Sequence, residues 1–107
     1  MSKNKNLEEV FNIAATKHSQ NEIKEAQILY IKILETNPNH SPTLNNLGVI
    51  FKELGEHQKA KDCYEKAIEI NPNYASAYNN LGNIFIELGE HQKARDCYEK
   101  AIEIDPN

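Results

Sequence analysis

The sequence contains no tryptophan, one methionine and two cysteines in 107 residues, and only 7% of it is aromatic. It has no run of about 18 apolar residues, the length that a membrane-spanning helix requires. No apolar segment follows the polar start at residues 1–6, so we expect no secretory signal in these residues. The net charge of −4 argues against nucleic acid as a partner, because such binding needs a basic face. We therefore expect a soluble helical protein without membrane or nucleic-acid contacts.

The two cysteines, Cys63 and Cys97, occupy equivalent positions in two similar segments of the sequence. Neighbouring helices pack roughly 8–10 Å apart, whereas a disulfide requires two Cα atoms within about 7 Å. We therefore predict two free thiols, each a small residue on an outer helix face. Free thiols are typical of a reducing compartment, so we expect a cytoplasmic protein.

Residues with catalytic chemistry are few and badly spaced. His57 and Cys63 recur as His91 and Cys97, but six residues correspond to about 240° around a helix. A Cys–His dyad therefore does not form within either segment. The sequence also lacks a glycine-rich phosphate loop, a Ser/His/Asp arrangement and a converging set of metal ligands. It predicts no enzymatic activity, no cofactor and no metal site.

What the sequence does contain is a repeat. Residues 41–73 and 75–107 agree at 25 of 33 aligned positions without a gap. Self-similarity at a fixed period of about 34 residues indicates a stacked array of helical units. Apolar periodicity predicts six helices, which we expect at residues 7–19, 22–36, 41–54, 56–70, 75–88 and 90–104.

Small residues recur inside the predicted helices. We place Gly48 and Gly82 where the two helices of one copy cross, since a missing side chain lets two backbones approach. The turn between the two helices has Asn21, Gly55 or Gly89 at the same position. Glycine, and asparagine after it, tolerates the left-handed conformation that ends a helix.

The spacing of the repeated residues resembles the tetratricopeptide repeat. In the second copy these residues are Leu44, Leu47, Gly48, Phe51, Ala60, Tyr64 and Pro72. In the third copy they are Tyr78, Leu81, Gly82, Phe85, Ala94, Tyr98 and Pro106. The tryptophan of the family pattern is replaced by Leu44 and Tyr78. Residues 7–40 resemble a degenerate first copy, in which Lys17 replaces the aromatic residue of Phe51.

This resemblance implies an all-α fold, an α-solenoid of three helix-turn-helix units that form a short right-handed superhelix. The expected division is a disordered N-terminus at 1–6, a degenerate first repeat at 7–40, a second at 41–74 and a third at 75–107. Family arrays usually end in a polar capping helix, which is missing here, so we expect a fragment of a longer protein.

The resemblance also places a concave groove along the first helix of each copy. The candidate peptide-binding residues in this groove are Asn12, Asn46, Asn80, Asn45, Asn79, Asn83, Phe11, Val49 and Lys52. Asn12, Asn46 and Asn80 hold the same position in the three copies and resemble the asparagine ladder of O-linked N-acetylglucosamine transferases. Such carboxamides can hold the main chain of an extended peptide. Alternatively, they bond to neighbouring helices and stabilise the stack.

A second groove chemistry in this family, the carboxylate clamp, grips the acidic C-terminal end of chaperones. It requires lysine and asparagine in the first copy, asparagine in the second, and lysine and arginine in the third. Here Asn46 matches, whereas the other four slots hold Phe11, Ala15, Ser76 and Asn80. We therefore do not expect this chain to bind a chaperone tail.

The sequence thus favours a non-catalytic protein–protein interaction module that binds an extended peptide segment. The alternative is a structural or assembly domain that associates through its open C-terminal end. In that case Tyr98 and Ile102, which repeat Tyr64 and Ile68, would form a weak homodimer. A further possibility is the N-terminal part of a larger repeat protein with a downstream catalytic domain.

Overall fold

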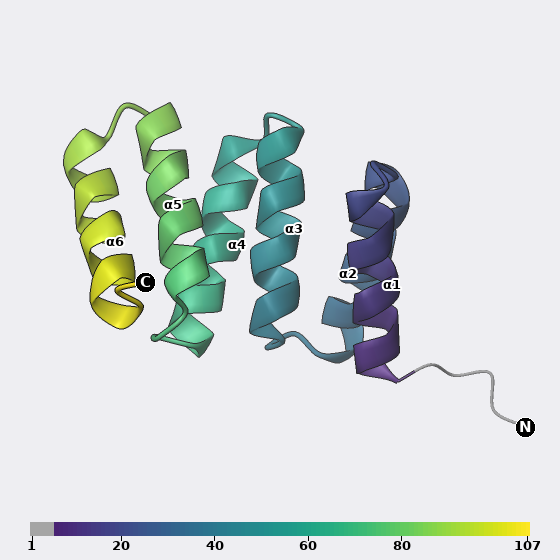
Figure 1. The fold of residues 1–107 in the computed structure, drawn as a ribbon. Helices are drawn as coiled ribbons and strands as arrows, with labels where there is room; N and C mark the ends of the chain where they lie inside the picture. Colours follow the sequence, from purple (N-terminus) through teal and green to yellow (C-terminus); the bar gives the residue numbers. More distant parts are fainter. Residues whose placement is uncertain (1–5) are drawn as a thin grey trace, which may run out of the picture.

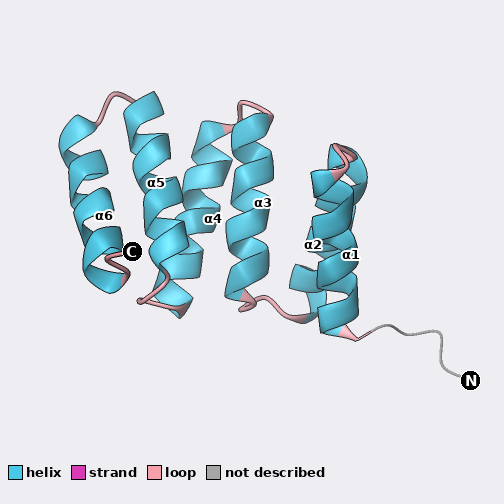
Figure 2. Cartoon of the chain, viewed as in Figure 1, coloured by secondary structure: helices cyan, strands magenta, loops and turns pink. Residues whose placement is uncertain are grey.

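The computed structural model describes residues 6–107, which fold into six helices and contain no strand (Figures 1 and 2). The helices are α1 (Leu7–Ser19), α2 (Ile23–Thr36), α3 (Ser41–Glu53), α4 (His57–Ile70), α5 (Ala75–Glu87) and α6 (His91–Ile104). Consecutive helices pair as three hairpins that stand side by side along an axis of 53 Å (Figure 1). The predicted all-α solenoid is therefore confirmed, and its hairpins begin at regular intervals along the sequence.

The turn inside each hairpin has the same backbone conformation. Asn21, Gly55 and Gly89 have φ angles of 64°, 79° and 78°, all in the left-handed region. L-residues with a side chain rarely adopt this region, and asparagine does so more readily than most. The three turns therefore reverse the chain identically, which keeps the hairpins in register.

The N-terminal end of α1 is closed by Asn6. Its side chain accepts a hydrogen bond from the Glu9 backbone at 2.8 Å, and its own N–H donates to the Glu9 carboxylate at 3.0 Å. This reciprocal capping box satisfies two backbone donors that the helix leaves unpaired. Of the N-terminus that we expected to be disordered, residues 1–5 lie outside the described part, whereas Asn6 belongs to the helix cap.

The two helical glycines make room for a tyrosine ring. A Cβ atom added to Gly48 would lie 2.5 Å from Cε1 of Tyr64, and one added to Gly82 would lie 2.6 Å from Cε1 of Tyr98. Both tyrosines come from the second helix of the same hairpin. The crossing predicted from the sequence is therefore correct, but an aromatic side chain, rather than a second backbone, fills the space.

The cysteines lie inside the stack, and the prediction that they occupy outer faces is wrong. Cys97 is 8% exposed and belongs to the cluster around Tyr64 and Leu81, while Cys63 packs against the cluster around Tyr30. Each therefore points from the second helix of one hairpin toward the preceding hairpin. Both thiols are free, and burial raises the pKa of Cys63 to about 11 and also raises the pKa of Cys97. Neither thiol is suited to act as a nucleophile, because the thiolate is the reactive form.

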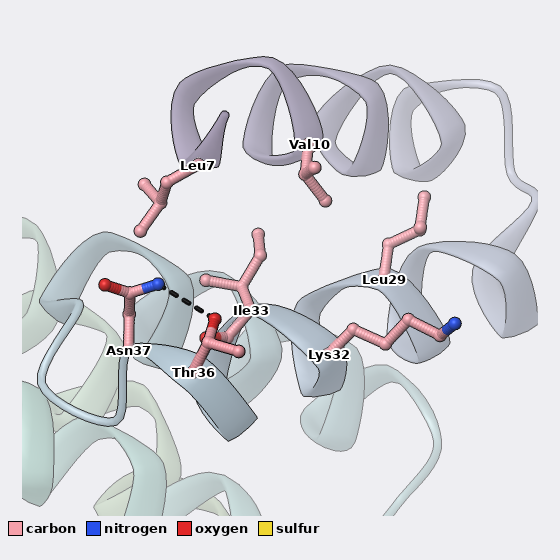
Figure 3. A pocket seen from close by; sticks show the side chains of 7 residues that line it. All are labelled: Leu7, Val10, Leu29, Lys32, Ile33, Thr36 and Asn37. Carbon is pink, nitrogen blue, oxygen red and sulfur yellow. Dashed lines mark hydrogen bonds between the residues drawn. The ribbon is translucent and has the colours of Figure 1, made fainter. Parts of the chain in front are cut away.

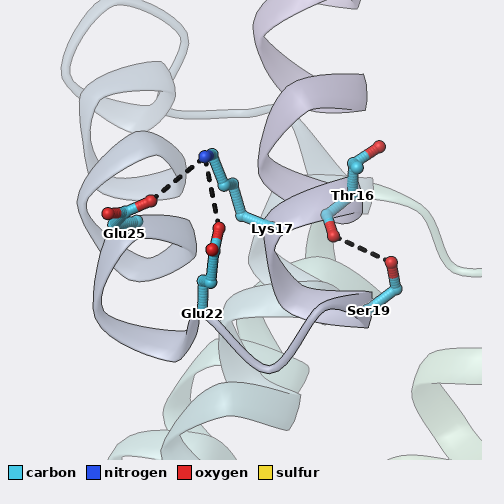
Figure 4. Close-up of polar contacts among 5 residues, drawn as sticks. All are labelled: Thr16, Lys17, Ser19, Glu22 and Glu25. Carbon is cyan, nitrogen blue, oxygen red and sulfur yellow. Dashed lines mark hydrogen bonds and ion pairs between the residues drawn. The ribbon is translucent and has the colours of Figure 1, made fainter.

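The first hairpin replaces a core aromatic with an ion-pair cluster. Lys17 occupies the position that Phe51 and Phe85 hold in the other hairpins. Its ammonium group lies 3.2 Å from both Glu22 and Glu25, and these hydrogen-bonded carboxylates raise the pKa of Lys17 (Figure 4). The end of the stack formed by α1 and α2 is therefore charged where the inner hairpins are aromatic.

No helix within residues 6–107 combines the length and the apolar composition needed to cross a membrane.

Candidate functional site

The nine candidate groove residues all lie on α1, α3 and α5, the first helices of the three hairpins. Helices α3 and α5 contact each other directly, and a hydrogen bond between His18 and Glu53 connects α1 to α3. The side chains on this face fall into two groups. Some side chains form hydrogen bonds or packing contacts with a neighbouring helix, and others have polar groups that are free to bind a ligand.

Asn45 belongs to the first group. It is only 5% exposed, accepts a hydrogen bond from Asn80 at 3.0 Å and donates one to Ser76 at 3.4 Å. These bonds join α3 to α5 across the boundary between two hairpins. Buried polar groups are stable only when they are paired, and this network pairs them. The Asn45 side chain therefore links two helices and is not exposed to a peptide in the groove.

The three asparagines of the predicted row, Asn12, Asn46 and Asn80, differ in their hydrogen bonds. Asn46 donates to the Tyr30 hydroxyl at 3.1 Å, and Asn80 donates to Asn45, so two of its three members contact the protein itself. Both side chains remain partly exposed, and each carboxamide keeps a further N–H and its carbonyl oxygen. Asn12 is exposed, lines a separate hollow on α1, and has no hydrogen-bond partner within residues 6–107.

The other predicted residues are distributed in the same way. Phe11 packs its ring against Tyr30 and edge-on against His40, with ring centroids 5.9 and 5.4 Å apart. Val49 packs against the core, and Lys52 is partly buried. Asn79 and Asn83 are exposed, and Asn83 accepts a hydrogen bond from the hydroxyl of Tyr98.

A pocket of about 320 Å³ opens where α1 meets α3, and we call it the α1–α3 pocket. It is lined by Ala15, His18, Ser19, Asn21, Ile23, Tyr30, Asn46, Val49 and Glu53. On its wall, Nε2 of His18 lies 2.8 Å from Oε1 of Glu53. Our sequence prediction chose Asn46 and Val49 but missed His18 and Glu53. Both lie at groove positions of the repeat, but neither recurs in all three copies.

A second hollow of similar volume lies between α1 and α2 (Figure 3). Its walls are mostly apolar, with Leu7 and Val10 on α1 facing Leu29 and Ile33 on α2 (Figure 3). Polar atoms occur at its edge, where Asn37 donates to a neighbouring hydroxyl. It contains none of the nine predicted residues, so it does not contribute to the groove.

Within residues 6–107 no three histidine, cysteine, aspartate or glutamate side chains converge on a possible metal position. The groove is instead rich in carboxamides, with one histidine–glutamate pair and one lysine. Such a surface is suited to hydrogen bonding and charge recognition.

Hairpins of equal size, stacked at regular intervals and held by repeated contacts, define a helical repeat protein. The family model for the tetratricopeptide repeat matches residues 41–74 and 75–107, and the chain belongs to this family.

Several solved structures share the fold. The crystal structure of MamA aligns with a TM-score of 0.85 and 25% identity, over 94% of this chain and 58% of that chain. The Sgt2 TPR domain from Aspergillus fumigatus aligns with a TM-score of 0.87 and 26% identity, over 94% and 67%. The first TPR of Spaghetti (RPAP3) bound to HSP90 peptide SRMEEVD has a TM-score of 0.89 at 22% identity, over 94% and 80%, and shows the fold alone. No curated protein matches the sequence, and the chain spans little more than half of the MamA chain.

Proposed function

We propose that this chain is a non-catalytic interaction module that holds an extended segment of a partner protein in the groove along α1, α3 and α5. The observation that carries the proposal is the partial exposure of Asn46 and Asn80. Each is fixed by one hydrogen bond to the protein and keeps a donor and an acceptor for a ligand. Polar groups that are held in place lose less conformational entropy when they bind.

A solved structure of the same fold supports a peptide as the ligand. The first TPR of Spaghetti was solved bound to the HSP90 peptide SRMEEVD, so a domain of this fold can hold a peptide. Our chain lacks the basic residues of the carboxylate clamp, since only Asn46 matches that pattern. We therefore propose a groove that binds the peptide main chain and does not select an acidic tail.

The test begins with peptides selected from a random 12-residue display library and measures their affinity by fluorescence anisotropy. Replacing Asn12, Asn46 and Asn80 together with alanine should weaken binding about tenfold to a thousandfold, because each lost hydrogen bond is worth roughly 0.5–1.5 kcal/mol. Alanine substitution of Gln58, which is exposed on α4, is the control and should leave affinity unchanged. Unchanged affinity in the triple variant would remove the asparagines from the binding site.

A second candidate function, assembly with another copy of this chain, is favoured by the exposure of α6. Ile102 is 61% exposed, whereas the equivalent Leu34 and Ile68 pack between hairpins. Tyr98 is partly exposed on the same helix, although the equivalent Tyr30 and Tyr64 are fully buried. Exposed apolar side chains of this kind are typical of an interaction site when they form a patch of a few hundred Å².

We also propose that residues 7–40 are a degenerate first repeat that precedes the two repeats at 41–74 and 75–107. The hairpin of α1 and α2 has the same helix lengths and the same left-handed turn as the other two. The charged cluster around Lys17 replaces its core aromatic residue.

A further inference from the structure

The α1–α3 pocket combines apolar walls with a charged edge. Ala15 and Val49 contribute aliphatic surface from the two facing helices, and Ile23 contributes more from α2. Glu53 lies at the edge, with a side chain that is 49% exposed. Long basic side chains fit this arrangement, because they bury an aliphatic stem and keep a charged head at the surface.

The carboxylate of Glu53 has binding capacity left. It accepts one hydrogen bond, from His18 at 2.8 Å through Oε1. A carboxylate offers about four lone-pair sites on two oxygens, so Oε2 can accept from a second donor. No lysine or arginine within residues 6–107 forms an ion pair with Glu53, although such pairs hold several other glutamates of the chain. The pocket thus presents a carboxylate that is not paired with a lysine or arginine of the described residues.

The charge of the surrounding groove has the same sign. The groove positions of α1, α3 and α5 include Glu8, Glu53 and Glu87 but only one lysine, Lys52. The chain as a whole carries a net charge of −4. A surface with a net negative charge attracts positively charged segments and repels negatively charged ones, which favours recognition of a basic segment.

We propose that the α1–α3 pocket binds a lysine or arginine side chain of the partner segment. Its stem packs between Ala15 and Val49, and its charged head donates to Glu53. This inference rests on the proposed function, in which the groove holds an extended segment. It adds the chemistry that selects that segment: the neighbouring asparagines hold the main chain, and Glu53 reads one basic side chain.

The contact of His18 with Glu53 supports this role. The imidazole fixes one carboxylate oxygen, so the second oxygen is held in place before the ligand arrives. A lysine ammonium needs one acceptor position and can use Oε2. An arginine in fork geometry uses both oxygens and would compete with His18. Both basic side chains fit the charge of the site, and their comparison in the experiment shows which one fits the geometry.

The experiment uses the strongest peptide selected by the full chain from the random 12-residue library. In that peptide, each lysine or arginine is replaced in turn by glutamine, by glutamate and by the other basic residue. One replacement by glutamine should weaken binding about tenfold, and glutamate should weaken it more, because hydrogen bonds between charged groups are the strong ones. The exchange of lysine and arginine keeps the charge and should weaken binding less than glutamine does, and the tighter of the two peptides shows which side chain fits beside His18.

Glu53→Gln in the protein should cause a similar loss of about tenfold, and the loss should not increase when the peptide also carries its glutamine. This lack of additivity identifies the two groups as direct partners. Glutamine keeps the shape of Glu53 and an acceptor for His18, so the fold is retained. The matched control is Glu69→Gln, an exposed carboxylate on α4, which should change affinity less than twofold.

The possible outcomes separate this inference from the proposed function. If no library peptide binds the chain, the proposed function fails and this inference fails with it. If peptides bind through the asparagines but contain no essential basic residue, or if Glu53→Gln leaves their affinity within twofold, only the basic pocket is overturned. A tenfold, non-additive loss that spares Glu69→Gln supports it.

Discussion

The ring of Tyr64 fills the space that a side chain at position 48 would occupy, so Gly48 can be replaced only if the ring shifts. A Cβ atom there would approach Cε1 of the ring to 2.5 Å, and real Cβ contacts are never so short. Tyr64 is fully buried between two hairpins, so its ring has no space into which to move. The same tyrosine ring therefore packs against Gly48 inside the second hairpin and against the residues between the hairpins, so a change at Gly48 affects both contacts.

From this contact we predict that Gly48→Ala destabilises the protein. Overpacking of a filled core costs about 1–3 kcal/mol, while alanine regains up to about 1 kcal/mol of helix propensity. The net loss should lower the melting temperature by several degrees, since about 1 kcal/mol corresponds to roughly 4–8 °C for a domain of this size. Thermal unfolding followed by circular dichroism measures the change.

Gly82→Ala is the matched control, because it introduces the same methyl group against Tyr98. This ring is partly exposed at the α6 end of the stack and can shift outward. Helix propensity should then offset most of the cost, and the melting temperature should stay within about 4 °C of the parent, or roughly 1 kcal/mol. Equal losses in both variants would contradict the idea that burial of the tyrosine decides the outcome.

A second prediction concerns Asn45, which joins α3 to α5. Asn45→Ala removes the acceptor of Asn80 and the donor to Ser76, and should lower the free energy of unfolding by about 1–3 kcal/mol. Asn79→Ala changes an exposed carboxamide on the same face and should stay within about 0.5 kcal/mol. Urea titration of both variants checks this. A loss of similar size in both would indicate helix propensity instead of the network.

The thiols provide a third prediction. Since burial raises the pKa of Cys63 from 9.0 to about 11, its thiolate fraction at pH 8 falls about 100-fold. The direction is the same for Cys97. Cys63 should react with a disulfide reagent at least about 100-fold more slowly in the folded chain than in urea, and Cys97 should also react more slowly when folded. Rapid reaction of either thiol in the native protein would show that the hairpins separate readily.

A fourth prediction tests the exposed face of α6. If Tyr98 and Ile102 bring two copies together, sedimentation velocity should show a dimer that grows with concentration into the millimolar range. The association should be weak, because a few apolar side chains bury less than the roughly 800 Å² per partner of a standard interface. Tyr98→Glu should abolish it. A monomer at all concentrations, or a dimer unchanged by Tyr98→Glu, would count against assembly as a function.

The fold could be predicted because its signals are local and repeated. The regular period, the left-handed turn at Asn21, Gly55 and Gly89, and the crossings at Gly48 and Gly82 can each be inferred from the residues at one position of the repeat. Repetition made each prediction more secure, because the residue at a position in one copy can be compared with the residue at the same position in the next. The family model matches the two copies in which these residues are complete.

The site was harder to predict because its side chains depend on contacts between hairpins. Sequence spacing placed Asn45 and Asn46 on the same face, but the structure buries the first and leaves the second partly exposed. The pair of His18 and Glu53 was missed because it joins different positions of two copies. The position of the cysteines was misjudged for a related reason, since the preceding hairpin covers them.

The central claim is that the groove of α1, α3 and α5 binds an extended segment. The most direct measurement is a two-dimensional NMR titration of the ¹⁵N-labelled chain with a peptide selected from the library. We predict that the largest amide shifts fall on these three helices, around Asn46, Val49 and Asn80, and that α4 and α6 change little. Shifts concentrated instead on α6, around Tyr98 and Ile102, would contradict the claim.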